Sequence, residues 1–154
     1  IIIPRHVHRA NKIKNEIQKL NLRVHMHDSK KKIHPKTDVY LVNSFGQTKS
    51  FFKICKTVFL GGSIIKHGGQ NPLEATRYGC NVVHGPNVWN FEEIYYLLKK
   101  YEFSNKINNP GQLTAKIDEI FNMKINSKNI EIKIKKLGDK ILNSTFNEID
   151  YLIN

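Results

Sequence analysis

The sequence has few cysteines, few acidic residues and no long apolar run, and each shortage excludes a class of protein. Its two cysteines, Cys55 and Cys80, are too few for a disulfide framework. Both lie in apolar stretches, which predicts reduced core side chains in a cytosolic domain. No run of about 18 apolar residues is present, so the sequence predicts no transmembrane helix.

The shortage of acidic residues makes the chain strongly basic. Only 13 Asp and Glu stand against 25 Lys and Arg in 154 residues, which gives a formal net charge of +12 at pH 7. This balance favours an anionic partner: nucleic acid, an acidic membrane surface, or a phosphorylated or carboxylated ligand. The overall composition, 40% hydrophobic and 25% charged, is that of a globular domain and argues against disorder, collagen and a coiled-coil rod.

Short apolar runs alternate with amphipathic segments along most of the chain. Strands are predicted at 1–3, 23–27, 38–42, 57–60, 81–84 and 103–107, and helices at 9–20, from 46, at 72–78, 91–101 and 112–121. This alternation predicts an α/β fold with a doubly wound parallel sheet. Ligands of such sheets bind where the loops leave the carboxyl ends of the strands. The chain opens on three isoleucines without an initiator Met, and we expect it to be a piece of a longer protein.

The tail, residues 124–154, has a different pattern. Residues 130–134 alternate like a strand, yet Ile130, Ile134, Leu137 and Ile141 also keep helical spacing. The length of the pattern favours a helix, and we expect its role to be packing.

Two glycine-bearing segments follow the strand at 57–60. Residues 61–63 end that strand, and residues 68–74 lead into a helix. Glycines let a backbone approach a ligand closely, and the free amides of a helix N-terminus attract anions. A structural interpretation makes Asn71 the N-cap, Pro72 the first helical residue and Glu74 part of a capping box. A functional interpretation has Glu74 accept hydrogen bonds from a ligand diol such as a ribose. Both interpretations use the same carboxylate oxygens.

Two other loops leave predicted strands at the same edge. Arg5, in the Pro-Arg-His turn after the first strand, can clamp a phosphate or carboxylate, or can be a solvated loop arginine. Residues 43–47 follow the third strand and open a helix, so their amides can face a ligand or form an ordinary turn. Three such loops at one edge of the sheet are stronger evidence for a ligand site than any one loop alone.

The order of these motifs resembles a known family. Pro-Arg-His, Ser-Phe-Gly-Gln, Phe-Leu-Gly-Gly-Ser, Gly-Gly-Gln-Asn-Pro-Leu-Glu and His-Gly-Pro-Asn-Val-Trp-Asn-Phe resemble the C-terminal half of bacterial Kdo (3-deoxy-D-manno-octulosonic acid) transferases. The resemblance covers residues 1–121, nearly four-fifths of the chain. It implies a Rossmann-like domain that is one half of a GT-B fold. Residues 1–123 are then the CMP-Kdo binding domain, and residues 124–154 pack on that domain or on the N-terminal half.

The resemblance also implies which residues contact CMP. They match the family's Pro-Arg pair, its Met-Gly-Glu segment and its Asn-Pro-Leu-Glu run: Pro4, Arg5, Phe45, Gly46, Gln47, Asn71, Pro72, Leu73 and Glu74. Glu74 is the implied ribose partner, and Arg5 lies near the nucleotide or phosphate. Second choices, close to the phosphate or the sugar acid, are Gly62, Ser63 and Lys66.

Two positions depart from the family pattern. Gln47 stands where the family commonly has Glu, and Gln70 where it commonly has His, so the roles of these side chains stay open. The family is an inverting glycosyltransferase that needs no metal or other cofactor. Its catalytic base is a carboxylate of the N-terminal domain, which also contacts the lipid A precursor (lipid IVA) acceptor. The resemblance therefore implies no catalytic residue here, and a chain that binds CMP without transferring sugar.

The implied parent enzyme works at the cytoplasmic face of the bacterial inner membrane, while this piece of it is expected to be soluble. We hypothesise that the lysine-rich segment 133–136 assists contact with that membrane. The other basic run, 30–32, lacks interleaved aromatic residues for base stacking, which argues against nucleic acid as a partner.

Other residue patterns are weaker. The seven histidines form no recognisable ligand pattern with cysteines or carboxylates, so we expect no metal site. Trp89, Phe91, Tyr95 and Tyr96 are expected in the core and on a helix face rather than as a ligand platform. Two alternative functions remain open: a basic module that binds nucleic acid or acidic lipid, and another GT-B enzyme that uses a UDP-sugar. A preference for cytidine nucleotides would separate the Kdo transferase domain from an enzyme that uses a UDP-sugar. Salt-dependent polyanion binding without nucleotide competition would favour the basic module.

Overall fold

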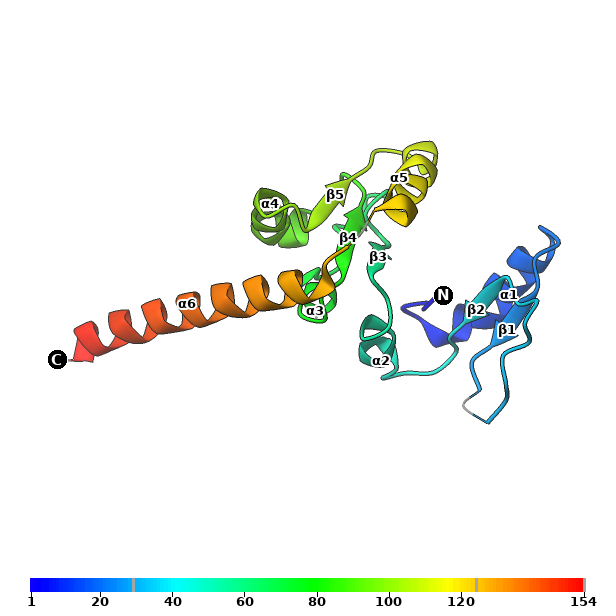
Figure 1. The fold of residues 1–154 in the computed structure, drawn as a ribbon, viewed down its shortest axis with the longest axis horizontal. Coiled ribbons are helices and arrows are strands. Elements are labelled where there is room, and N and C mark those ends of the chain that lie inside the picture. Colours follow the sequence, from blue (N-terminus) through cyan, green and yellow to red (C-terminus); the bar gives the residue numbers. More distant parts are fainter. Residues whose placement is uncertain (29, 124, 154) are drawn as a thin grey trace. The chain divides into compact units, whose positions relative to one another are not determined.

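A computed structural model of the chain describes residues 1–28, 30–123 and 125–153. The chain divides into two compact units, Ile1–Ser50 and Phe51–Asn154 (Figure 1). The helix α2, Thr48–Phe52, spans the division. We describe each unit by itself.

The first unit is a small parallel sheet with one helix. It contains a 3₁₀ turn (Val7–Arg9), α1 (Ala10–Gln18), β1 (Val24–Met26) and β2 (Val39–Leu41). The two strands pair in parallel, with Val24 opposite Val39. The predicted first strand is reduced to an isolated parallel bridge between Ile2 and Leu41. Two backbone hydrogen bonds hold it, from Ile2 N to Tyr40 O at 2.8 Å and from Val42 N to Ile2 O at 2.9 Å.

The second unit is built on three parallel strands in the order β3-β4-β5. The strands are β3 (Thr57–Leu60), β4 (Asn81–His84) and β5 (Ser104–Lys106). Helices α3 (Leu73–Thr76), α4 (Glu92–Lys100), α5 (Pro110–Asn122) and α6 (Ser127–Ile153) connect and cover them, and a 3₁₀ turn, Trp89–Phe91, precedes α4 (Figure 1).

The core of this unit lies on both faces of the central strand. All four residues of β4 are buried. Val82 belongs to an apolar cluster with Leu60 and Tyr95, whereas Val83 belongs to another cluster with Ile107 and Ile120. Neighbouring residues of a strand point to opposite faces, so β4 is covered on both sides. This explains why its two central residues, Val82 and Val83, are both apolar.

The parallel α/β class predicted from the sequence is confirmed, and β3 and β4 have the predicted bounds. The described strands nevertheless form two sheets, of two and three strands, instead of one. The pattern of side chains identifies strands, but it does not say which strands pair, because pairing depends on contacts far apart in the sequence.

Helix α6 confirms the helical interpretation of the tail. Its first turns bury Ile130 and Ile134 against Leu98 and Phe103. Beyond residue 138 every described residue of the helix is exposed. Figure 1 shows this part of α6 extending away from the rest of its unit. No helix in the described part of the chain is long and apolar enough to cross a membrane.

The two cysteines are free thiols. Cys80 is fully buried, as predicted, and its single S–H faces two carbonyl acceptors, Phe52 O at 3.3 Å and Cys55 O at 3.1 Å from the sulfur. Burial raises the pKa of Cys80 to about 12. Cys55 is half-buried and packs at the edge of the same apolar cluster.

Candidate functional site

The loops that follow β3 and β4 are joined by hydrogen bonds at the carboxyl end of the sheet. The Ser63 hydroxyl donates to Leu60 O at 2.6 Å and accepts from Gly85 N at 2.9 Å. Asn87 N donates to Ser63 O at 2.9 Å, and Asn87 Nδ2 donates to Ile64 O at 2.9 Å. These bonds tie the first loop to the second at its base.

The turn at Gly68 lies against the segment that leads into α4. Gly69 N donates to Gly62 O at 3.2 Å, and Asn90 N donates to Gly68 O at 3.3 Å. Gly68 has a φ of +80°, and a Cβ there would stand 2.3 Å from Asn90 Nδ2 and 2.8 Å from Trp89 Nε1. This turn therefore favours a glycine, both for its backbone conformation and for its close approach to these two side chains.

The segment 71–74 emerges from this fixed loop. Asn71 Oδ1 accepts a hydrogen bond from Leu73 N at 3.0 Å, so Asn71 satisfies a backbone N–H at the start of α3. The N-cap is nevertheless Pro72 and not Asn71, because α3 begins at Leu73, one residue later than the capping interpretation predicts. Pro72 is buried and Leu73 is half-buried. Glu74 is exposed, and its carboxylate accepts no hydrogen bond from the described residues. Of the two roles that compete for its oxygens, the capping role is unused in the structure.

The buried end of β4 adds a histidine that sequence analysis did not single out. His84 Nδ1 lies 2.7 Å from Gly85 O and so donates to it, and its ring centroid is 4.2 Å from that of Tyr95. Burial lowers the pKa of His84 from its ordinary value of 6.5. Tyr95, whose pKa burial raises, donates from its hydroxyl to Gln70 O at 2.9 Å. In the sequence, His84 could have been singled out as a polar residue at the end of a predicted strand, directly before Gly85 and Pro86.

The aromatic residues near this loop divide between core and surface. Tyr95 is buried and Phe91 packs against the same apolar cluster, as predicted. Tyr96 is on the exposed face of α4. Trp89 is 54% exposed, so the prediction of a core position is wrong for this side chain. It lies in the turn between β4 and α4, where it contacts Gly68 instead of the apolar interior.

The first unit holds the other predicted residues. Because Ile2 and Leu41 pair in parallel, the turn with Pro4 and Arg5 and the loop 43–47 leave the sheet at the same edge. Arg5 is exposed and Pro4 half-buried. In the neighbouring loop Phe45 is 79% exposed, Gly46 has a φ of +78° and Gln47 is half-buried.

The structure thus gathers the predicted site residues into two sets, one in each unit. The set of the second unit lies on the loop after β3 and at the start of α3 and consists of Gly62, Ser63, Lys66, Asn71, Pro72, Leu73 and Glu74. Lys66 is exposed and Gly62 is half-buried, whereas Ser63 is fully buried.

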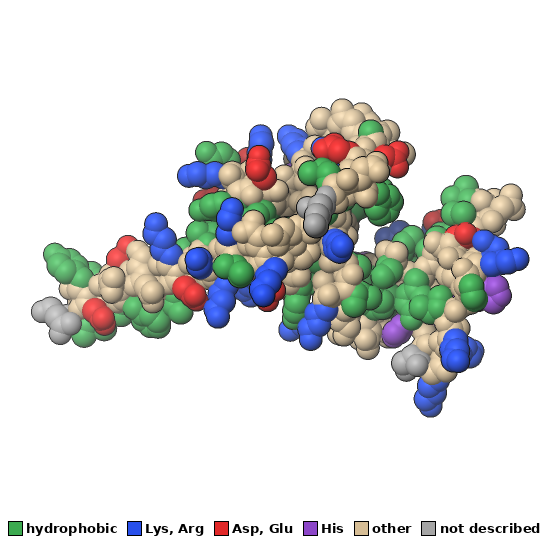
Figure 2. All heavy atoms as spheres, viewed as in Figure 1, with side chains coloured by type: hydrophobic (Ala, Val, Ile, Leu, Met, Phe, Trp, Pro, Cys, Tyr) green, Lys and Arg blue, Asp and Glu red, His purple; other side chains and the backbone are tan. Residues whose placement is uncertain are grey.

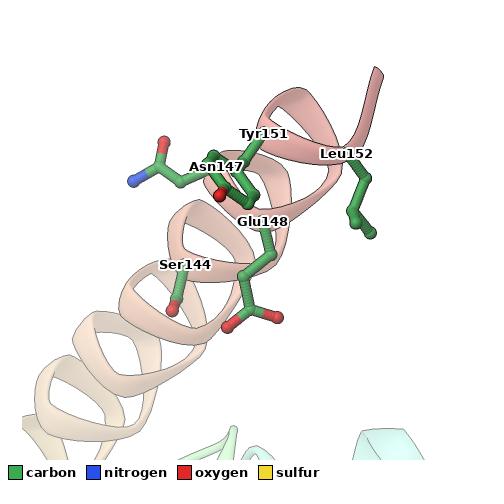
Figure 3. Close-up of a pocket in the computed structure, with 5 residues that line it drawn as sticks. All are labelled: Ser144, Asn147, Glu148, Tyr151 and Leu152. Atoms are coloured by element: carbon green, nitrogen blue, oxygen red, sulfur yellow. The ribbon is translucent and has the colours of Figure 1, made fainter. Parts of the chain in front are cut away.

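Two further features lie outside these sets. Among the described residues, no group of three or more His, Cys, Asp or Glu side chains is placed to hold a metal ion. A shallow depression is lined only by residues of distal α6: Ser144, Asn147, Glu148, Tyr151 and Leu152 (Figure 3). Figure 3 shows these side chains spread around one helix, and none of them was predicted as a site residue.

No family model matches the chain. Curated relatives do: the chain is 27% identical over 142 residues to 3-deoxy-D-manno-octulosonic acid transferase from Haemophilus influenzae and 26% identical over 141 residues to that from Aquifex aeolicus. Each match covers 92% of the chain, but only 33% and 37% of the relative. The chain therefore spans about a third of the length of these relatives.

A solved structure matches as well. It is the C-terminal CMP-Kdo binding domain of WaaA from Acinetobacter baumannii, with a TM-score of 0.77 and 26% sequence identity. The match covers 87% of this chain and 71% of that one. The fold defines the class as a parallel α/β domain, similar to a solved CMP-Kdo binding domain. Within this class the chain is related to the Kdo transferases and is similar to their C-terminal domain, as the motifs predict.

Proposed function

We propose that the chain is the donor-binding domain of a Kdo transferase and binds CMP-Kdo. The observation that carries the proposal is the exposed carboxylate of Glu74, which bonds to none of the residues that the structure describes. It is exposed at the end of a loop whose backbone is fixed by hydrogen bonds on both sides. A carboxylate held in this way can accept both hydroxyls of a ribose.

Nine residues are proposed to contact CMP, as the family resemblance implies: Pro4, Arg5, Phe45, Gly46, Gln47, Asn71, Pro72, Leu73 and Glu74. Arg5 has the planar guanidinium suited to a phosphate, and it is exposed. Gly62 and Lys66 are proposed near the phosphate or the sugar acid. The buried position of Ser63 favours a different role for that residue, which we argue below.

In the parent enzyme the donor is cleaved as the acceptor hydroxyl attacks, and CMP leaves with the electrons of the glycosidic bond. The domain then has to stabilise the charge that develops on the phosphate. Arg5 and Lys66 are the cations proposed for this. The general base that removes the acceptor proton is proposed to lie in the N-terminal domain, as the resemblance implies, so this chain alone binds CMP without transferring Kdo.

Residues 1–123 are proposed to form the donor-binding part, and residues 124–154 to be a packing element. The burial of Ile130 and Ile134 supports packing on the domain itself. The exposed apolar side chains further along, such as Phe146 and Ile149, leave a surface for the N-terminal half of the parent protein. Hydrophobic side chains are visible along this part of α6 in Figure 2.

The first test is a calorimetric titration of the 154-residue chain with CMP, UMP and ADP. We expect saturable binding that prefers CMP over UMP and ADP, because CMP is the nucleotide of the proposed donor, CMP-Kdo. A Phe146→Ser variant serves as the control, since distal α6 is proposed to touch no ligand, and its CMP affinity should equal that of the wild type. A preference for UMP would favour an enzyme that uses a UDP-sugar. Equal, salt-sensitive binding of all three nucleotides would favour a basic polyanion-binding module.

We further propose that the parent enzyme acts at the cytoplasmic face of the inner membrane on a lipid A precursor, and that lysines of α6 contact the membrane. Lys133, Lys135 and Lys136 are exposed, and Lys133 also lies 5.7 Å over the Phe103 ring. Figure 2 shows Lys and Arg side chains gathered around the first turns of α6.

Replacing Lys135 and Lys136 with Gln in the full-length enzyme tests the membrane contact. We expect binding to vesicles with anionic lipid to weaken by roughly 10–30-fold, because each basic residue near such a surface contributes about 1 kcal/mol. Lys133 is left intact because its substitution would also disturb packing. The paired control is Lys99→Gln with Lys100→Gln, two exposed lysines of α4. Equal vesicle binding by both double variants would contradict the proposal.

A further inference from the structure

We propose that Ser63 is a positioning residue of the donor site rather than a ligand contact. Its hydroxyl ties the loop after β3 to the loop after β4, and this tie holds the segment 68–74 that presents Glu74. The proposal rests on the proposed function for its consequence in binding, while the tie itself is a property of the free protein.

The Ser63 hydroxyl both donates and accepts a hydrogen bond within the protein. A serine hydroxyl has one hydrogen to donate, and Ser63 donates it to Leu60 O at 2.6 Å. Its oxygen accepts from Gly85 N at 2.9 Å. The residue is 0% exposed, so a ligand at the surface of the loop does not reach it.

The backbone on either side of Ser63 links it to the segment that faces the proposed ligand. On one side Gly62 O accepts a hydrogen bond from Gly69 N, which closes the turn that precedes residues 70–74. On the other side Ser63 O and Ile64 O accept from the backbone and side chain of Asn87. Ser63 therefore stands where the base of the glycine-rich loop joins the second loop.

Removing the hydroxyl weakens this joint without removing any proposed ligand contact, while the two hydrogen bonds from Asn87 to Ser63 O and Ile64 O remain. In Ser63→Ala the N–H of Gly85, itself buried, loses its acceptor, and the loop base loses its link to Leu60. The segment 68–74 then samples more conformations in the free protein. Ligand binding has to restore the ordered one, which raises Kd.

A matched control is available in the same sheet. Ser104 is also buried, at 7% exposure, and its hydroxyl donates to Tyr95 O at 3.5 Å. It lies at the amino end of β5, away from the loops that follow the strands. Ser104→Ala therefore removes a buried hydroxyl without touching the joint between the two loops.

The test compares hydrogen exchange and CMP affinity in wild type, Ser63→Ala and Ser104→Ala, well below the unfolding temperature of each. In the ligand-free protein we expect Ser63→Ala to speed exchange in peptides that cover residues 68–74 by about tenfold, and to raise the Kd for CMP by about five- to tenfold. Ser104→Ala should lower the unfolding temperature but change neither the exchange of residues 68–74 nor the Kd for CMP.

Unchanged exchange of residues 68–74 in Ser63→Ala would overturn the proposal, whether or not CMP binds. A wild-type chain that binds no CMP would instead count against the proposed function, and the exchange comparison would still decide the role of Ser63. If Ser63→Ala does not fold, Ser63→Cys keeps a weaker donor and acceptor. Faster exchange in that variant supports the proposal, and wild-type exchange overturns it.

Discussion

Replacing Glu74 with alanine is expected to weaken CMP binding by roughly 30–100-fold, without lowering the unfolding temperature. Hydrogen bonds to a charged group contribute about 1.5–3 kcal/mol, and a ribose diol would lose two partners at once. The stability of the folded state should not change, because the Glu74 side chain is exposed and the carboxylate bonds to none of the described residues. Calorimetric titration with CMP and a thermal melt measure the two quantities.

Two variants sharpen this experiment. Glu93→Ala removes another exposed glutamate, in the first turn of α4, and should leave CMP affinity unchanged. Glu74→Gln keeps one acceptor oxygen without the charge, so its affinity should fall between those of wild type and Glu74→Ala. If Glu74→Ala binds CMP as tightly as Glu93→Ala, Glu74 is not the ribose partner.

Gly85→Ala should lower the free energy of unfolding by about 3–5 kcal/mol, or prevent folding altogether. A Cβ at this position would stand 2.3 Å from Ser63 O and 2.5 Å from Ile64 N. Both are backbone atoms, so the clash is relieved only by moving the two loops apart, and overpacking of this kind is strongly destabilising. Urea unfolding followed by far-UV circular dichroism measures the change in the free energy of unfolding.

Gly61→Ala is the matched control for this glycine. It lies in the loop that Gly85 contacts, but a Cβ there would meet no atom within 4 Å. Its free energy of unfolding should change by less than about 0.5 kcal/mol, as at other open surface positions. Equal stability of the Gly85→Ala and Gly61→Ala variants would show that the loops are not held together as the structure describes.

The regular elements follow closely from the sequence, and β3 and β4 show why. Both are short, mostly apolar runs bounded by turn residues, so local pattern alone identifies them. The long helix of the tail follows from its length, although residues 130–134 alternate like a strand. The two separate sheets do not follow, because strand pairing depends on contacts far apart in the sequence.

The candidate site divides in the same way. Motif order predicted the relationship to Kdo transferases, which the relatives and the solved domain confirm. The site residues that it implied stay a prediction. The roles of Ser63 and His84 could not be predicted, because each depends on which backbone groups surround a buried side chain. The exposure of Trp89 is of the same kind, since only the folded turn decides whether an aromatic ring faces the core.

The sequence by itself determined most of the strands and helices, the basic charge and the similarity to Kdo transferases, since these are properties of local pattern and motif order. Only the tertiary structure decided that the hydroxyl of Ser63 makes its hydrogen bonds inside the protein, while the carboxylate of Glu74 bonds to none of the described residues. The physical reason is that a polar side chain has a limited number of hydrogen bonds, and the fold decides which of them are satisfied internally and which remain for a ligand.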